Sequence, residues 1–479
     1  MRSSILVLPA LLISATCVAS DFNELWDQVP AGGNAFMAID VAKTLTTPIA
    51  KKNGWGRKLT EGGSDRPLYL PPEADKVLSV ANFDIVRNFQ RSWNVSLFSM
   101  TEPIPLKLVA RAEGGYVDKI SDVDVVWLPS DAYVLMAGKN DLAMQAPANR
   151  QAVAGWISSQ KSGQASQKSD YLAVAFAGIN LKPHIVLALD SEHALQIRRV
   201  TQHLEQSEFA KKHNLDFEPT AELIAGLRGM VMEITFTDKA TARTKIDFSQ
   251  PVSFNKTVAK ALVLGALEAR QMSLPGLDSA KFSVFDKSII IEGELTMDAL
   301  RRVLSLMEPP STKFSSLKDT NVEEATGDDM AANSLAYFKS TQSYLKDLRQ
   351  QGGSHNSDAY WTDRYAAKID QLPILHVDDD LLDYGQKLTE TLRVMSGSRK
   401  MTNLEGGMAA RNEMSGGGYG YGYDNYNYSS PRSRVVDAGN ARTDAVARGS
   451  SVKIQGWDLI DNATTEIRRE MTKRYNVEF

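Results

Sequence analysis

The sequence has almost no cysteine and no long apolar run. Of its 479 residues only Cys17 is a cysteine, and Cys17 lies in an N-terminal segment that we expect to be removed. The rest of the chain therefore lacks the thiolates that disulfides, catalytic thiols, thiolate zinc sites and iron–sulfur clusters require. After residue 20 no stretch reaches the roughly 20 apolar residues of a membrane span. We expect a mature chain without a transmembrane helix.

Charge of one sign is not concentrated anywhere in the chain. Lys and Arg number 54 and Asp and Glu number 58, and neither sign forms a long run. Nucleic-acid binding needs a basic surface that neutralises phosphates, so we expect no nucleic-acid partner. Hydrophobic residues make up 43% of the chain, which is the composition of a folded globular protein.

Familiar catalytic and cofactor motifs are also missing. The sequence has no His-Glu-x-x-His, no Gly-x-Ser-x-Gly and no Lys-Thr-Gly, and glycines 416–422 do not match Gly-x-Gly-x-x-Gly. We interpret the Ser-x-x-Lys matches at 158–161, 315–318 and 343–346 as chance in a chain rich in both residues. The sequence therefore predicts no catalytic, cofactor-binding or metal-binding residue, and no cofactor.

Two acidic clusters were candidates for a metal or proton-relay site. Residues 376–380 read HVDDD, but no glycine-containing loop surrounds them as calcium requires. We interpret these carboxylates as caps at the start of a helix, where the helix dipole favours negative charge. Residues 190–193 read DSEH, and the next histidines, His203 and His213, do not fall on the same helical face.

The N-terminus has the layout of a secretory signal peptide. Arg2 precedes an apolar core at residues 5–13, and small residues follow it. We expect residues 1–20 to be the signal peptide, with cleavage after Ala19 or Ser20. The protein is therefore expected to be exported to the periplasm, the cell envelope or the extracellular space.

Residues 21–160 are predicted to form a first α+β module. A helix is predicted at 148–158, and the polar segment 161–170 ends the module. Strand patterns occur at residues 35–41, 77–81, 94–99, 106–110, 123–128 and 133–137.

Residues 171–310 are predicted to form a second α+β module. Residues 230–237 and 244–248 alternate apolar and polar side chains, which predicts an antiparallel ribbon with one buried face. Strands are also predicted at 171–178, 184–189 and in a ribbon at 282–295, and helices at 190–212, 256–272 and, behind a Thr296 cap, 297–307. Whether the two modules are repeats of one unit stays open.

The C-terminal third is predicted to be helical. Residues 319–396 form the helical region, and residues 397–450 are a Gly/Tyr/Ser/Arg-rich segment that we interpret as a disordered linker. The run GGGYGYGYDNYNYSS at 416–430 lies within it. Residues 451–479 are predicted to form a last helix that packs back on the body. The predicted fold class is α+β, two antiparallel-sheet-plus-helix modules followed by a helical C-terminal region with a disordered insertion.

Four stretches resemble a known group of proteins. They are ELWDQVPAGGNAFMAIDVAKTLTTPIAKKNGW, PANRQAVAGWI, YAAKIDQLPILHVDDDLLDYG and IRREMTKRYNVEF. Together they are similar to uncharacterised secreted proteins of planctomycete-type bacteria. This resemblance implies export and an intact multi-module architecture, and it implies no activity and no site residue.

These observations favour an exported, non-enzymatic binding or structural protein of the envelope or periplasm. Its partner would be an envelope protein or a polysaccharide. Two alternatives stay open. One is an envelope hydrolase whose carboxylates come together only in the fold. The other is a matrix protein that associates through the Tyr/Gly run.

Overall fold

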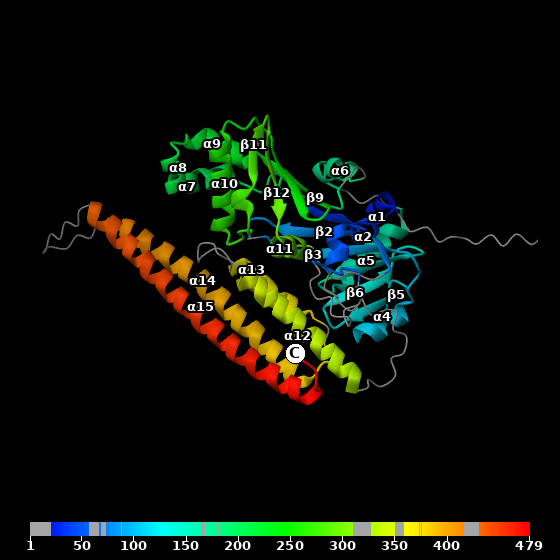
Figure 1. The fold of residues 1–479 in the computed structure, drawn as a ribbon. Helices are drawn as coiled ribbons and strands as arrows, with labels where there is room; N and C mark the ends of the chain where they lie inside the picture. Colours follow the sequence, from blue (N-terminus) through cyan, green and yellow to red (C-terminus); the bar gives the residue numbers. More distant parts are fainter. Residues whose placement is uncertain are drawn as a thin grey trace, which may run out of the picture.

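The computed structural model describes most of the chain from residue 21 to residue 479. Outside the description lie residues 57–66, 69–72, 88, 164–167, 180–182, 310–326, 350–358, 373, 375 and 416–430, and the side chains of 208–209, 327–329, 398–415 and 431–451. The expected signal peptide and the Tyr/Gly run are thus not among the described residues. Figure 1 shows a sheet with helices on both faces, beside which a long pair of helices extends.

Twelve strands of the described residues form one antiparallel sheet. The first part of the chain contributes β1 (Ala35–Asp40), β2 (Ala74–Asp84), β3 (Gln90–Met100), β4 (Tyr116–Ile120), β5 (Val123–Leu128), β6 (Ala132–Met136) and β7 (Asp141–Ala146). The second part contributes β8 (Ile185–Asp190), β9 (Leu227–Phe236), β10 (Ala240–Phe248), β11 (Lys281–Phe285) and β12 (Ser288–Leu295). Their spatial order is β11-β12-β10-β9-β8-β1-β2-β3-β7-β6-β5-β4.

The pairing of β1 with β8 joins the two parts of the chain. Met37 lies opposite Leu187 in this antiparallel pair. From it the order β1-β2-β3-β7 runs outward on one side and the order β8-β9-β10-β12 on the other. The two predicted modules therefore contribute to a single sheet. In each half, three consecutive strands run outward from the centre, and a later strand of the same half lies next to the third.

Helices cover both faces of the sheet. They are α1 (Phe22–Asp27), α2 (Val41–Leu45), α3 (Pro48–Lys52), α4 (Leu106–Glu113), α5 (Arg150–Lys161), α6 (Asp170–Ala177), α7 (Ile197–Glu205), α8 (Glu208–Lys212), α9 (Phe217–Ala225), α10 (Lys256–Ala269), the 3-10 helix η2 (Leu277–Ser279) and α11 (Met297–Ser305). We name the sheet face that carries Met37 and Ile39 face A, and the face that carries Phe36 and Ala38 face B. Face A packs against α2, α3, α4 and α11, and face B packs against α1, α5 and α6.

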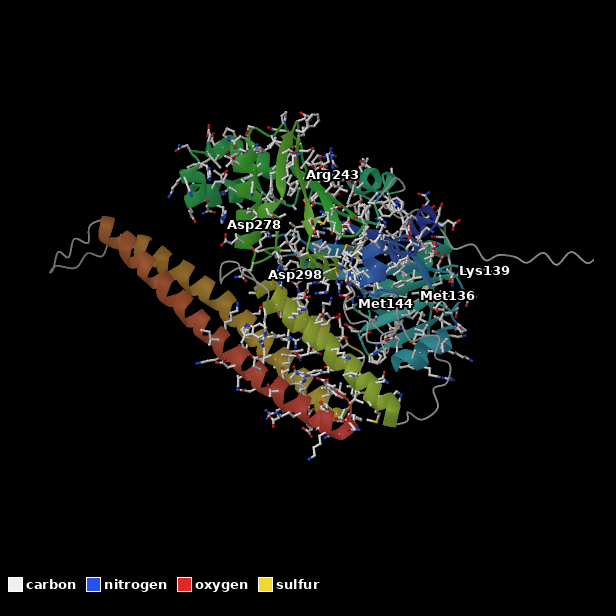
Figure 2. The ribbon with its side chains drawn as sticks, viewed as in Figure 1. Met136, Lys139, Met144, Arg243, Asp278 and Asp298 are labelled. Atoms are coloured by element: carbon white, nitrogen blue, oxygen red, sulfur yellow. The ribbon has the colours of Figure 1, made fainter. Side chains whose placement is uncertain are left out.

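Face B of the second half of the sheet carries charges instead of apolar side chains. Arg243 on β10 lies between Glu233 on β9, at 3.8 Å, and Glu292 on β12, at 3.6 Å. Figure 2 shows Arg243 on this half of the sheet. The opposite side of the same strands carries Ile234 and Phe236, which are fully buried. The predicted β9–β10 ribbon with one buried face is confirmed.

The C-terminal third is helical. It contains α12 (Gly327–Arg349), α13 (Ala359–Asp370), α14 (Asp379–Ser415) and α15 (Pro431–Tyr475). The hairpin of α14 and α15 extends past α13 in Figure 1. At Gly456 the helices approach so closely that a Cβ would lie 2.5 Å from the sulfur of Met395. Buried side chains such as Ile460, Ile467 and Met471 place α15 against its neighbours.

The structure confirms the α+β class with a helical C-terminal region. Helices α14 and α15 extend into the range 397–450 that we predicted as a linker, up to Ser415 and from Pro431. Alanine, which has the highest helix propensity, occurs four times in residues 431–450.

Two predicted strands are wrong. Residues 106–110 belong to helix α4, which Gly114 ends in the left-handed conformation at φ 70°. Residues 171–177 of the strand predicted at 171–178 belong to helix α6, whose first turn is capped by the Ser169 hydroxyl and whose C-cap is Gly178. Both are short apolar runs, which periodicity does not assign to helix or strand. The helix predicted at 190–212 is interrupted, because α7 begins at Ile197 and ends at Glu205 before α8.

A buried ion pair joins the sheet layer to the helical region. Arg301 on α11 donates from Nε to Oδ2 of Asp347 on α12 at 2.5 Å. The carboxylate of Asp347 also accepts from the Tyr365 hydroxyl at 3.1 Å, and its backbone oxygen accepts from Arg302 Nη2 at 3.0 Å. Asp347 is fully buried. Burial, and after it the Asp347 charge, raises the pKa of Tyr365, so this hydroxyl stays a donor.

We predict that Asp347→Ala strongly destabilises the protein. The substitution removes one partner of a buried ion pair, the carboxylate that binds Arg301, and breaking such a pair costs about 3–5 kcal/mol of unfolding free energy. The matched control is Asp461→Ala, which removes the partner of the half-exposed Arg349 and should cost less than about 1 kcal/mol. Urea unfolding of both variants measures the difference. Equal losses would contradict the role of the Asp347 pair.

A second polar contact ties the two ends of the α14–α15 hairpin together. Asp378, just before α14, accepts from Arg474 Nη1 at 2.7 Å and from the Tyr475 hydroxyl at 2.7 Å. Burial of Asp378 acts to raise its pKa, but the hydrogen bonds from Tyr475 and Arg474 outweigh burial and hold the pKa below its ordinary value.

This lowered pKa predicts a pH dependence. Asp378 stabilises the fold at pH values above the ordinary Asp pKa of about 4, and this stabilisation is lost as the pH falls through the lower, folded-state pKa. Asp378→Asn should therefore lower the unfolding free energy at neutral pH, and the gap to the wild type should shrink in acid. Urea unfolding across a pH series measures it, with Asp379→Asn, an exposed neighbour at the start of α14, as control. A gap independent of pH would refute the assignment.

Candidate ligand-binding pocket

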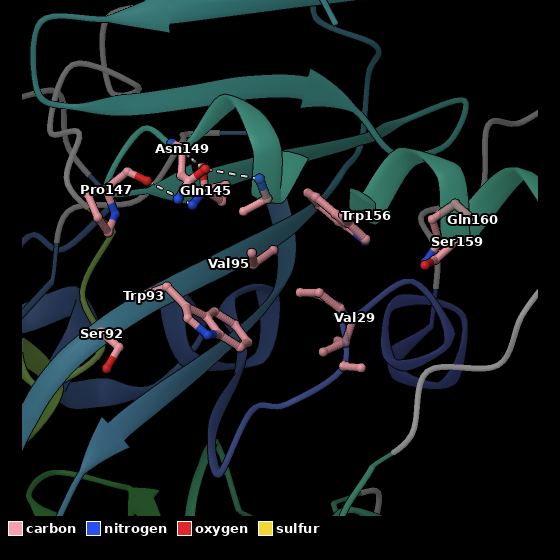
Figure 3. Close-up of a pocket in the computed structure, with 13 residues that line it drawn as sticks. Val29, Ser92, Trp93, Val95, Gln145, Pro147, Asn149, Trp156, Ser159 and Gln160 are labelled. Atoms are coloured by element: carbon pink, nitrogen blue, oxygen red, sulfur yellow. Dashed lines mark hydrogen bonds between the residues drawn. The ribbon is translucent and has the colours of Figure 1, made fainter. Parts of the chain in front are cut away.

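A cavity of about 520 Å³ opens on face B of the first half of the sheet. Its walls come from β3, from β7 and the turn that follows it, from α5, and from the loop after α1 (Figure 3). The lining residues are Val29, Pro30, Ala31, Ser92, Trp93, Val95, Gln145, Pro147, Asn149, Ala152, Trp156, Ser159 and Gln160.

Gln145 and Asn149 form the wall where β7 turns into α5. Gln145 is buried, and its Nε2 donates to the carbonyl of Pro147 at 2.7 Å while its Oε1 accepts from the backbone N–H of Asn149 at 3.2 Å. Asn149 then caps α5, because its Oδ1 accepts from the N–H of Ala152 at 3.0 Å. These bonds fix the turn, so the amide groups have one defined position.

Helix α5 is held against the segment after α1 through one carbonyl. The indole N–H of Trp156 donates to the carbonyl of Gln28 at 2.9 Å, and Gln160 Nε2 donates to the same oxygen at 3.0 Å. Trp156 is 7% exposed. Its ring therefore forms a rigid apolar part of the wall.

Trp93 on β3 is the second aromatic wall. It is only partly buried, and Figure 3 shows it on the strand side of the cavity, away from Trp156 on α5. Gly33 gives it room, because a Cβ there would lie 3.5 Å from the Trp93 ring and 2.4 Å from a methyl group of Val80. The backbone at Gly33 therefore requires a residue without a side chain.

The chemistry of the lining is neutral. It has two indoles, three carboxamides and two hydroxyls, and none of the lining residues is an acid, a lysine, an arginine or a histidine. Carboxamides and hydroxyls both donate and accept hydrogen bonds. Such a surface recognises an uncharged ligand that has apolar faces and hydroxyl or amide groups.

A second described cavity, of about 270 Å³, lies between α12 and α15. It is lined by Gln342, Leu345, Lys346, Arg349 and Asp461. Arg349 forms an ion pair with Asp461 and stacks over the ring of Trp457 at 4.5 Å. Arg349 and Asp461 already bind each other, so this hollow is a less promising site than the face B pocket.

The two acidic clusters of the sequence form local hydrogen bonds and an ion pair. Asp378 accepts from the N–H of Asp380 at 3.1 Å, as expected of a cap at the start of α14, and also accepts from Arg474. In the DSEH run, Asp190 accepts from the N–H of Glu192 at 2.8 Å. Within the described residues, no three His, Cys, Asp or Glu side chains are grouped to hold a metal ion.

The other motifs are scattered. Of the Ser-x-x-Lys matches, 158–161 lies on α5, 343–346 lies on α12, and 315–318 lies outside the described residues. Four Asn-x-Ser/Thr sequons are found at Asn94, Asn255, Asn427 and Asn462. Asn94 is 1% exposed, which leaves no room for a glycan in the folded chain.

The residues of the pocket were not identified from the sequence. Trp93, Gln145 and Trp156 belong to no motif, and about fifty residues separate the first two. The one signal was the stretch PANRQAVAGWI, which contains the turn and the first part of α5. Sequence alone did not show that this stretch lies against β3.

Comparison with known proteins adds little. No family model and no curated protein matches the chain. Two crystal forms of TP0453 are similar solved structures: form I is 11% identical, with a TM-score of 0.33, over 61% of this chain and 97% of that one. Form IV is 12% identical, with a TM-score of 0.32, over 58% and 95%. Similarity at this level supports no conclusion about function. Among the described helices, none is long and apolar enough to cross a bilayer.

We predict that the cap and the pocket role of Asn149 can be separated. Asn149→Ala removes the acceptor for the N–H of Ala152 and should cost about 1 kcal/mol of unfolding free energy. Asn149→Asp keeps that acceptor and places a negative charge at a helix N-terminus, so it should retain the wild-type stability. Thermal and urea unfolding of both variants check this. An Asp variant as unstable as the Ala variant would show that the cap depends on the amide group.

Proposed function

We propose that the protein is an exported binding protein of the envelope or periplasm that holds an uncharged sugar segment of a polysaccharide in the face B pocket. One observation carries the proposal: a pocket of about 520 Å³ lined by two tryptophans, three carboxamides and no ionisable side chain. Its size falls within the usual range of ligand pockets, roughly 300–1,000 Å³.

A sugar ring matches this lining better than other envelope ligands. Its C–H faces are apolar and stack on indole rings, and its hydroxyls bind the carboxamides as both donors and acceptors. A phosphate or carboxylate ligand would call for a cationic partner, which the lining does not offer. The N-terminal leader supports a compartment where polysaccharides are found.

Binding is favoured over hydrolysis at this site. Glycoside hydrolysis generally uses two carboxyl groups about 5–10 Å apart that flank the scissile bond. The lining of the face B pocket contains no carboxyl group, and that of the smaller cavity contains only Asp461. The pocket therefore offers recognition without an acid and a base.

We predict that Trp93→Ala weakens glycan binding at least about tenfold, a loss of about 1.4 kcal/mol. The matched control is Trp127→Ala, which removes another partly buried tryptophan, on β5, outside the pocket and stacked on Tyr116 at 5.3 Å. Calorimetric titration of wild type and variants with neutral and acidic polysaccharide fragments measures the effect. The proposal fails if the wild type binds no neutral fragment or if Trp127→Ala is the weaker binder.

Asn149→Asp is a second test of glycan binding, and it leaves side-chain packing unchanged because Asn and Asp have nearly the same shape. It exchanges the amide donor for a charged acceptor, so binding of a neutral fragment should fall while stability is kept. The same titrations measure it. Unchanged affinity in this variant, together with weakened binding by Trp93→Ala, would restrict the ligand to the β3 side of the pocket, near Trp93.

A further inference from the structure

The two edge strands of the twelve-stranded sheet differ in whether side chains bind their outward backbone groups. At one edge lies β4, and at the other lies β11. An edge strand presents unpaired N–H and C=O groups that can pair with another strand, and proteins commonly block such groups.

The β4 edge is occupied by side chains of its own half. In the hairpin closed by Ser121 and Asp122, the register places the N–H and C=O of Lys119 on the side away from β5. Its carbonyl accepts from Arg150 Nη2 at 2.5 Å, and its N–H donates to Asp118 Oδ1 at 2.6 Å. Arg150 also pairs with Asp118. A further strand cannot use these groups without displacing Arg150.

At the β11 edge, the described part of the chain contributes no side-chain hydrogen bond to the outward backbone groups of the strand. Phe285 pairs with Ser288 beside the turn, so the alternation of the antiparallel ladder points the backbone groups of Phe282 and Val284 away from β12. None of the described residues pairs with β11 on this side. The exposed side chains at the two ends of the strand are Lys281 and Phe285, which are 78% and 73% exposed.

We propose that β11 is a self-association edge, where β11 of a second copy adds antiparallel with Ser283 opposite Ser283. In this register Phe282 of each copy pairs with Val284 of the other, through two backbone hydrogen bonds per pair. The sheet would then continue from one copy into the next. This inference does not depend on the proposed function, because the pocket lies in the other half of the sheet.

The ends of the strand are complementary in this arrangement. Antiparallel pairing places Lys281 of one copy opposite Phe285 of the other, where an ammonium group can lie over the ring. Asp286 of the second copy follows Phe285 and offers a carboxylate to the same lysine. The two lysines lie at opposite ends of the interface, so they do not repel each other. Ser283, small and uncharged, lies at the two-fold axis.

The interface is small, and this sets its strength. Four backbone hydrogen bonds and a few side chains bury less than a standard interface of about 1,600 Å². We therefore expect reversible dimers that form as the protein concentration rises, and not a permanent dimer.

The first experiment uses a cysteine at the two-fold axis. Ser283→Cys is made in a chain whose single cysteine, Cys17, is replaced by Ser. Facing residues of a non-hydrogen-bonded pair have Cα atoms about 4.5 Å apart, within the range that a disulfide spans. Ser283→Cys should oxidise to a covalent dimer much faster than Ser253→Cys, an exposed loop control. Equal rates for the two variants would overturn the proposed register.

The second experiment measures association without a cross-link. In sedimentation, Phe285→Lys should weaken dimerisation about tenfold or more, since it removes the ring and places an ammonium group directly opposite Lys281 of the other copy. Val284→Pro removes an N–H that points away from β12, so it should abolish dimers while β11 stays paired, with circular dichroism as the folding check. A wild-type protein that sediments as a monomer at every concentration, or dimers that both variants leave unchanged, would refute the proposal.

Discussion

The pairing of β1 with β8 is the contact on which the rest of the structure depends. The two strands are separated by about 150 residues, and their register, Met37 opposite Leu187, fixes both halves of the sheet at once. A one-residue slip would move every side chain to the other face. Phe36 and Met37 are both fully buried, on opposite faces, so neither face tolerates such a slip. The pocket and the β11 edge lie in different halves of the sheet, so this pair sets their relative position, together with the core that packs across both halves.

The two halves of the sheet share a strand order but differ in the face on which the helix after the last strand packs. On face B, residues paired across neighbouring strands form rows. The row that begins with Phe36, the second residue of β1, ends with Val95 and Gln145. The row that begins with Val186, the second residue of β8, ends with Arg243 and Glu292. Helix α5 follows β7 and covers the first row on face B, which creates the neutral pocket. Helix α11 follows β12 and packs on face A instead. The second row therefore stays in solvent and carries charges.

The position of α11 also explains how the helical region is attached. Because α11 packs on face A through Leu300 and Leu304, its arginines point to the other side, toward α12. Arg301 binds Asp347, and Arg302 lies over the ring of Trp361, at 5.7 Å, whose indole N–H donates to the carbonyl of Ser273. Directional contacts of this kind hold α12 and α13 in one orientation, whereas an apolar junction would allow several.

Sequence patterns predicted the elements that have one polar face and missed those whose surroundings come from distant residues. The β9–β10 ribbon shows a clear period of two, because water contacts one side of it. Helix α11 shows a period of 3.6, because the side that does not face the sheet carries the polar residues Arg301 and Arg302, although both are buried. Helix α6 has apolar residues on nearly all sides, so its pattern did not differ from that of a buried strand. The pocket was even harder to predict from sequence patterns. In the sequence, Trp93 and Trp156 do not differ from ordinary core residues. The pairing of β3 with β7 brings them together around Gln145. Long-range pairing decides which apolar residues line a hollow and which fill the core.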